Sequence, residues 1–535
     1  MKLLKKFAII VLSLTLVCSA AFPCAAADGQ PFKTILHRSF WNALESVTER
    51  IVTAIADAFP TPASWEQNDD TSDAFYPGTA QMLSAPAPDA AFSLGYDARS
   101  LLDGMDGIIG KLYVGGSIAF KDKFVTEVFD DLMVRSAAIA DGSGRGTALF
   151  LVVDAFGLSS PDVREIRRRI AAALPDEPLQ SITVSVLHQH SAVDTFGMNG
   201  NILEMALLNP LRNLLHLKTV NGKNNRYMEH LFEQCVASAA AAIRDMRPGH
   251  LYYGTADQRP YLIDKREPTV CDPNFNRFRF IPDDGSRETW LISSEIHCVG
   301  NGAAQREITG DYPYYAARYL DEQAGVNALF YLGAQQSTSQ NHTADTVINF
   351  SESNTSLQGI KGFGISIAQT LMQITEETEV APLLNLRMKE VTLPVLNPIL
   401  YLAAKVGMIN ANVVRTADGI GVRTELGYAE LGKDLAFAIV PGELEAALAY
   451  GGVLNGKEAW HGVDWLYPSM QQMLTDAGIS RKLMVIGLSN DQIGYIVPDN
   501  NYIPMIAEES NSIEFVSLGS RTASTLMAAF GEIIK

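Results

Sequence analysis

The sequence predicts an α/β fold in which mixed β-sheets are flanked by helices. Hydrophobic residues make up 47% of the 535 positions and charged residues 19%, which is the composition of a chain with a packed core. From residue 91 onward, short β-branched runs alternate with helical patterns. Several of these runs end in polar clusters, and catalytic residues of open α/β sheets gather at such strand ends. We therefore expect one large α/β domain over residues 91–535.

The N-terminus has the pattern of an export signal. Lysines at positions 2, 5 and 6 precede an eleven-residue apolar run over 7–17, and three alanines follow before Asp28. The run is shorter than the ~20 residues needed to span a bilayer. Residues 1–27 are thus predicted to be a cleaved signal peptide, which implies an exported protein, either periplasmic or extracellular.

Charge and cysteine content exclude several classes of protein. The 42 basic and 60 acidic residues leave a net charge of −18, which argues against a nucleic-acid partner and against electrostatic docking on anionic lipid. Cys235, Cys271 and Cys298 remain after the signal, too few for a disulfide framework. Neither a pairing among them nor the oligomeric state can be chosen from the sequence.

The remaining elements follow from hydrophobic periodicity. Residues 31–59 predict an amphipathic helix that packs on the main domain, and 60–88 read as a linker, so 28–90 form an N-terminal helix and linker. Strands are expected at 148–153, 182–187, 290–296, 328–332, 435–440 and 482–486, and helices at 163–174, 228–246, 313–324, 362–374, 444–454 and 521–534. Two apolar stretches, 202–217 and 391–409, are expected to be buried. The alternative is that they form the lips of a lipid-binding groove or a shallow membrane-docking surface, with transient membrane contact.

Histidines follow two of the predicted strands. His188 and His190 are separated by one residue, so in an extended chain they point to the same face and can bind one metal ion. His297 follows the strand at 290–296. The alternative for the first pair is two polar surface histidines.

Two oxygen donors stand in similar places. Glu443 follows the strand at 435–440, and Tyr495 comes after the strand at 482–486. The alternatives are a helix N-terminus for Glu443, where the helix dipole favours an acidic residue, and an ordinary half-buried aromatic for Tyr495.

These four segments occur in the order and rough spacing of the neutral/alkaline (non-lysosomal) ceramidase family of zinc amidases, which the chain resembles over roughly residues 91–535. Further similar segments are VFDDLMVRS at 128–136, LVVDAFGLS at 151–159, KREP at 265–268 and ITGDYPYYAARYLDE at 308–322. The chain ends about 40 residues after Tyr495, where family members carry a further immunoglobulin-like domain, so we expect a divergent member without that domain.

The resemblance implies a ligand set and an activity. A zinc ion would be held by His188, His297, Glu443 and Tyr495, while His190 would hydrogen-bond to substrate and Arg266 would add positive charge nearby. The expected reaction is zinc-dependent hydrolysis of an amide bond in a ceramide-like lipid or another N-acyl compound. The alternatives are a zinc hydrolase of a different amide or ester, and an inactive lipid-binding or carbohydrate-binding protein on the same scaffold.

The sequence allows two identities for the nucleophile. Aligning Gln336-Ser337 on the family's Gln-Ser segment makes Ser337 the attacking group. Anchoring on Phe330 and Gly333-Ala334 puts Gly333 in that place instead, and a water activated by zinc would then attack directly. The Gly-Asp pair that accompanies the family's serine is absent under either alignment.

Overall fold

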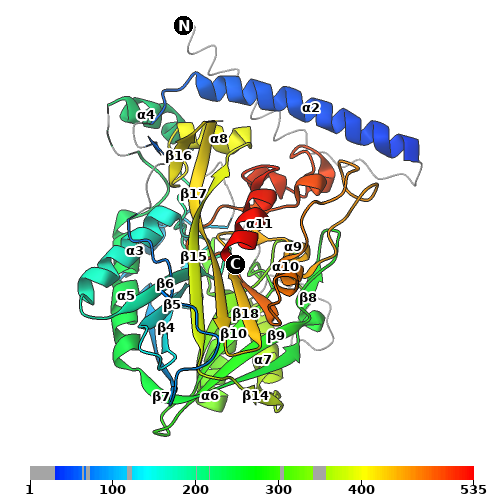
Figure 1. Cartoon of the computed structure of the whole chain (residues 1–535). Coiled ribbons are helices and arrows are strands. Elements are labelled where there is room, and N and C mark those ends of the chain that lie inside the picture. The colour runs from blue at the N-terminus through cyan, green and yellow to red at the C-terminus, as the bar shows by residue number, and fades with distance from the viewer. Residues whose placement is uncertain are drawn as a thin grey trace.

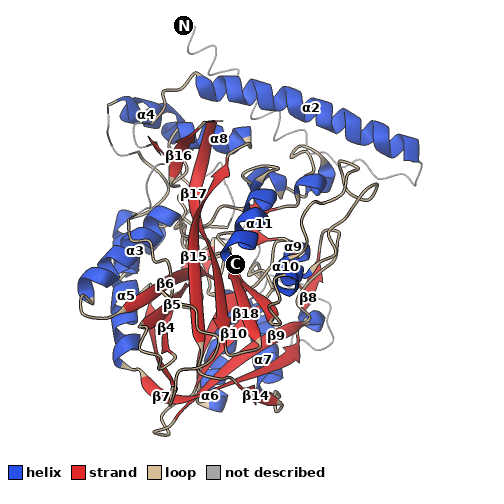
Figure 2. Cartoon of the chain, in the orientation of Figure 1, coloured by secondary structure: helices blue, strands red, loops and turns tan. Residues whose placement is uncertain are grey.

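The computed structural model describes residues 31–62, 65–67, 73–116, 123–200, 202–215, 217, 219–301, 306–341, 357–417 and 419–535. The predicted signal peptide lies outside these residues. Within them, two β-sheets pack against each other across one hydrophobic core, and the smaller sheet carries a second core on its other face; helices cover the outer faces (Figures 1 and 2). None of the described helices is long and apolar enough to cross a membrane.

The larger sheet has nine strands, and parallel pairs lie at both of its edges. Its order is β12(Asn327–Leu332), β10(Thr289–Ser294), β9(Asn274–Pro282), β7(Arg247–Asp257), β2(Phe92–Ser100), β4(Met133–Ala140), β5(Thr147–Val153) and β6(Leu179–Val186), with β14(Glu377–Glu379) beside β7. The pairs β10–β12 and β5–β6 are parallel, and the other pairs are antiparallel. Helices α3(Ser160–Ala173), α5(Asn225–Arg244), α6(Asp311–Ala324) and α7(Leu357–Met372) accompany this sheet.

The smaller sheet has six strands and includes the two long strands that rise through the centre of Figure 1. It contains β1(Glu66–Gln67), β16(Val413–Thr416), β17(Gly419–Leu431), β18(Leu435–Ile439) and β20(Lys482–Ile486), with β15(Leu384–Pro394) paired to β17. Helices α9(Ala446–Tyr450), α10(Met470–Asp476) and α11(Thr522–Ile533) pack on it.

The nine-stranded sheet curves until its two edges approach each other. Edge strand β12 contacts β4, β5 and β6 on the opposite side, as well as β20 of the smaller sheet. Backbone hydrogen bonds join the loops beyond these strands: the amide of His190 donates to the carbonyl of Cys298 (3.0 Å), and the amide of Gly487 donates to that of Leu332 (2.8 Å). The carboxyl ends of strands from both sheets therefore meet at one place.

All six predicted strands are present within a few residues of their expected bounds, and so are five of the six predicted helices; the sixth, α9, is a single short turn. The long strands β15 and β17 were not among the predicted strands, although β15 alternates polar with apolar residues as a strand with one buried face does.

A third group of helices lies at one end of the molecule. Helix α2(Pro31–Asp57) crosses that end, beside α8(Pro398–Lys405) and α4(Ile202–Leu214) (Figure 1). The expectation that the 202–217 stretch is buried was wrong, since α4 exposes most of its leucines. The 391–409 stretch forms the end of β15 and then α8, and its side chains other than that of Leu396 are buried or partly buried.

Candidate metal centre

His188 is held at the end of β6 with one ring nitrogen committed to the backbone. Its Nδ1 lies 2.7 Å from the carbonyl oxygen of Phe156. A carbonyl only accepts, so Nδ1 carries the proton and Nε2 presents a lone pair. That Nε2 lies 3.3 Å from Oε2 of Glu443. The backbone of His188 has a φ of 54°, in the left-handed region that non-glycine residues rarely adopt, so the surrounding structure imposes this backbone conformation.

His297 approaches the same carboxylate from the loop after β10. Its Nε2 lies 3.7 Å from Oε2 of Glu443 and 3.0 Å from Nε2 of His190. The ring also hydrogen-bonds to the backbone of Gln335. The three histidines thus present nitrogen atoms that all lie within 4.8 Å of one another.

Glu443 and Tyr495 are brought together by a short parallel pairing. Strands β19(Glu443–Leu444) and β21(Tyr495–Ile496) place Glu443 opposite Tyr495, and the two side chains hydrogen-bond to each other. Gln492 donates from Nε2 to the other carboxylate oxygen, Oε1, at 3.3 Å, and Gln335 lies 3.5 Å from Oε2. Glu443 therefore lies in the cluster and is not an exposed helix N-terminus, since its side chain is almost fully buried.

Burial keeps every member of this cluster uncharged when no cation is present. It lowers the pKa of His188 to about 4 and takes the pKa values of His190 and His297 well below the ordinary range; the positive charge of Lys265 lowers the latter two further. Burial also raises the pKa of Glu443 to about 8 and that of Tyr495 well above its usual value. A pocket of neutral imidazoles beside a buried carboxyl suits a divalent cation, which would supply the missing charge.

The donor set fits zinc. Imidazole nitrogens and a carboxylate are zinc ligands in catalytic sites, and bound histidines normally donate their other ring nitrogen to a carbonyl, as His188 does here. The structure brings His188, His190, His297, Glu443 and Tyr495 together. The division of these five residues into ligands of the ion and residues that face substrate remains a prediction from the resemblance.

Arg266 and Ser337 lie in the neighbouring segments. Arg266 is buried and forms an ion pair with Glu514 (2.6 Å) and a hydrogen bond to the carbonyl of Asn501 (3.0 Å). Ser337 is half-buried between β12 and β13(Thr338–Gln340), and its side chain hydrogen-bonds to Asp264. Their predicted roles toward substrate stay predictions.

Gly333 packs where a side chain would not fit. A Cβ at this position would lie 2.8 Å from the side chain of Glu295. Glu295 is buried, accepts hydrogen bonds from the Ala334 amide and the Tyr450 hydroxyl, and has its pKa raised by burial to about 8. Glycine at 333 is thus explained by the carboxyl group beside it.

Sequence reasoning missed the residues that position the histidines. Gln335 and Gln492 bracket Glu443, and Phe156 stacks on the His188 ring with centroids 4.4 Å apart. Gly116 has a φ of +75°, and a Cβ there would lie 2.4 Å from the Cα of His190. Phe156, Gln335 and Gln492 lie in or near segments that the sequence singles out, but the sequence gives no sign of their contacts, which join segments far apart in the chain.

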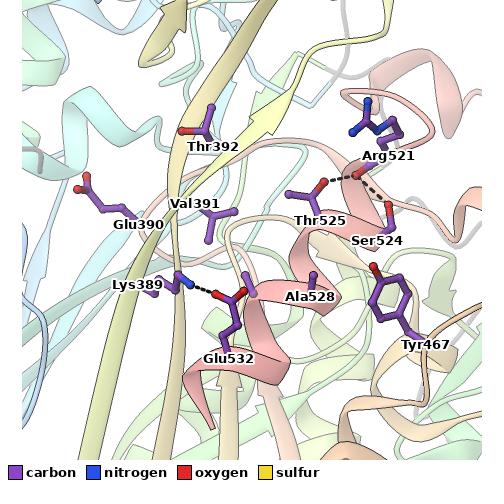
Figure 3. A pocket seen from close by; sticks show the side chains of 11 residues that line it. Lys389, Glu390, Val391, Thr392, Tyr467, Arg521, Ser524, Thr525, Ala528 and Glu532 are labelled. Carbon is purple, nitrogen blue, oxygen red and sulfur yellow. Dashed lines mark hydrogen bonds and ion pairs between the residues drawn. The ribbon is translucent and has the colours of Figure 1, made fainter. Parts of the chain in front are cut away.

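A surface cavity of about 470 Å³ lies elsewhere, between β15 and α11. Figure 3 shows the Lys389–Glu532 ion pair on one side of it and Tyr467 on the other. It contains none of the clustered histidines, so the candidate site is assigned from donor geometry and not from cavity size.

The fold and the cluster together define an α/β scaffold with a potential metal-binding histidine cluster at converging strand ends. The fold is that of neutral ceramidase. The chain aligns with the crystal structure of neutral ceramidase from Pseudomonas aeruginosa at a TM-score of 0.61, with 14% identity, covering 83% of this chain and 74% of that one. A structure of ceramidase complexed with C2 aligns at 0.60, with 14% identity over 83% and 75% of the two chains. No protein-family profile and no curated protein matches the sequence.

Proposed function

We propose that this protein is an exported, zinc-dependent amidohydrolase that cleaves the amide bond of a ceramide-like sphingolipid or another N-acyl compound. The observation that carries the proposal is the buried cluster of His188, His297 and Glu443, whose Nε2 and Oε2 atoms converge at 3.3 and 3.7 Å. The shared fold with neutral ceramidase supports the reaction class. A protein that merely binds lipid or carbohydrate has no use for such a cluster.

His188, His297, Glu443 and Tyr495 would hold the zinc ion, which can polarise an amide carbonyl and activate water. The protein's part is to keep the donors in place: Phe156 and Gln335 orient the two imidazoles, and Gln492 orients the carboxylate. His190 is buried beside His297 and is positioned to hydrogen-bond to a substrate oxygen. Burial excludes bulk water from these groups, which strengthens each interaction.

A hydrolase of a different amide or ester is favoured by one observation. Ser337, the serine that the resemblance offers as nucleophile, hydrogen-bonds to the carboxylate of Asp264, and Gly333 has no room for a side chain. The Gly-Asp pair that accompanies the family's serine is also absent from this loop, and substrate preference is the property most directly affected.

The test is elemental analysis of the mature protein combined with a screen of N-acyl sphingoid, N-acyl amino acid and ester substrates. We expect about one zinc per chain and hydrolysis of an N-acyl substrate that stops on chelation and returns with zinc. A folded protein that takes up no zinc contradicts the metal assignment, whereas zinc-dependent cleavage of esters alone selects the second candidate. N-terminal sequencing of the exported protein should start at Asp28.

A further inference from the structure

Helix α2 faces the body of the protein with polar side chains together with Trp41 and Ala56, while a row of large apolar side chains points outward. Five large apolar residues, each 39–59% exposed, form one stripe along it: Leu36, Phe40, Leu44, Val47 and Ile51. Spacings of three and four residues place them on a single face. A surface helix of a protein surrounded by water normally keeps such a row of apolar side chains on its buried face.

The inward face of α2 is fastened to the body by polar contacts. Arg38 donates to the carbonyl of Ala459 (2.8 Å), Asn42 accepts from the Trp460 indole (2.9 Å), and Glu45 accepts from the Met505 amide (3.1 Å). These bonds fix the rotation of the helix, so the apolar stripe is held outward by the fold.

A second apolar surface lies on α4. Leu207, Leu208, Leu211 and Leu214 share one face of this helix, and Leu215 and Leu217 continue it; all six are 40–65% exposed. The opposite side of the helix is anchored by buried Met205 and by Asn209, which bonds to the carbonyls of Val220 and Gly407. Of the 18 large apolar residues that the described part of the chain exposes, 11 belong to these two surfaces.

The two surfaces lie at the same end of the molecule, with α8 between them (Figure 1). Asp57 at the end of α2 accepts from the Tyr401 hydroxyl of α8 (2.8 Å), and Asn209 of α4 reaches the loop after α8. The loop after α8 also contacts the segment that orients His188. Its residue Asn410 donates a hydrogen bond to Ser159, which lies three residues beyond Phe156. The apolar end therefore adjoins the segments that hold His188.

Charge identifies the partner as a zwitterionic bilayer. The exposed side chains of α2 between Leu36 and Ala54 include Arg50 and His37 but no carboxylate, in a chain whose net charge is −18. An anionic membrane would be repelled by that net charge, whereas a neutral lipid surface accepts an apolar stripe without a basic partner face. Only three residues separate the expected mature N-terminus from α2, too few to cover the stripe.

We propose that the exposed apolar faces of α2 and α4 form a docking surface for a phosphatidylcholine-like bilayer, beside the metal centre. Such a helix lies in the interface with its apolar face ~5–10 Å deep. Docking does not rest on the proposed hydrolysis, because it uses none of the clustered donors.

The test is co-sedimentation of the full mature protein with phosphatidylcholine vesicles. Phe40→Ser/Val47→Ser/Ile51→Ser and, separately, Leu208→Ser/Leu211→Ser/Leu214→Ser should each lower the partition coefficient at least ~10-fold. Val128→Ser/Met372→Ser, which changes two exposed apolar residues on β3(Glu127–Val128) and α7, is the matched control and should bind like the wild type. Unchanged circular dichroism would show that all variants are folded.

A second readout reports insertion directly. Tryptophan in Val47→Trp should shift its emission to the blue with vesicles and be quenched by lipids brominated on the acyl chain. His297→Ala should bind vesicles as well as the wild type, which separates docking from hydrolysis. The proposal is overturned if the α2 and α4 variants sediment with the vesicles as the control and the wild type do, or if the protein binds anionic vesicles more strongly than neutral ones. It is also overturned if the stripe instead drives dimerisation that the α2 variant abolishes without lipid.

Discussion

His188 and His297 each aim Nε2 at one oxygen of Glu443, from loops more than one hundred residues apart. Removing either imidazole deletes a ligand without opening the hydrophobic core. We expect His188→Ala and His297→Ala to lose zinc and activity together while far-ultraviolet circular dichroism stays unchanged. His190→Ala is the matched comparison: it should keep zinc, measured by elemental analysis, and lose turnover. Full zinc occupancy in the His188→Ala/His297→Ala double variant would disprove the ligand assignment.

The raised pKa of Glu443 leads to a prediction about the protons released when zinc binds. With its pKa raised by burial to about 8, the metal-free carboxyl is about nine-tenths protonated at pH 7, whereas the histidines, with lowered pKa values, are neutral. Zinc binding should therefore release a proton from Glu443 at pH 7, and this release should be smaller at pH 9. Calorimetric titration in buffers of different ionisation enthalpy measures this release. Glu443→Gln should abolish it and weaken zinc binding severely; unchanged zinc affinity would leave Glu443 a structural residue.

Ser337 decides between the two ways of attacking an amide. If its hydroxyl attacks, Ser337→Ala should lower turnover by several orders of magnitude with zinc content unchanged. If activated water attacks directly, activity should stay within about tenfold. We expect the second result, because the Ser337 side chain is bonded to Asp264. An acyl adduct on Ser337 found by mass spectrometry with a slow substrate would reverse that expectation.

At the scale of elements, helix α2 is attached to the rest of the protein partly through the titratable side chain of Glu45, which accepts a hydrogen bond from the Met505 amide. Burial raises the pKa of Glu45 to about 7, so the folded protein holds this proton more tightly than the unfolded chain does. The stabilisation is complete below the ordinary pKa of about 4.5 and is lost as pH rises through about 7. Hydrogen-exchange protection factors of α2 amides should therefore fall between pH 5 and pH 8, and Glu45→Gln should flatten that dependence.

The matched control for α2 is Glu458→Gln, an exposed carboxyl on the loop that α2 contacts. This variant should keep the wild-type dependence of protection on pH. If protection of the α2 amides in the Glu45→Gln protein still falls with pH as steeply as in the wild type, a group other than Glu45 causes the pH dependence.

At the scale of the whole molecule, the metal centre joins the two sheets, because His188 follows β6 of the larger sheet and Glu443 follows β18 of the smaller one. An ion bound only by the folded state adds stability; at 100-fold excess over its Kd the gain is about 2.7 kcal/mol. Chelation should lower the Tm of the wild type by about 2–3 °C, measured by calorimetry, and restoring zinc should reverse the change. His297→Ala should show no zinc-dependent shift, and a wild-type Tm indifferent to chelator would contradict a resident metal.

The strands that lead into the site could be predicted because each is a short apolar run ending in a polar residue, a pattern set by local residues alone. The inward orientation of the polar side of α2 could not. Periodicity shows that a helix has two faces, but only the partners Ala459, Trp460 and Met505, supplied more than 400 residues later, determine which face is buried. For the same reason the exposed leucines of α4 were expected to be buried.

Local residue patterns are enough to predict the α/β class, the six strands around the centre and the types of donor: imidazoles, a carboxylate and a phenol. Tertiary structure alone decided that the donors meet. The nine-stranded sheet curves until its edges touch, and the loop after β20 closes over them, so His188, His297 and Glu443 converge from two sheets. The hydrophobic pattern of the sequence indicates which residues are buried. Which buried residues become neighbours is determined by long-range strand pairing and sheet curvature, and both depend on contacts throughout the chain.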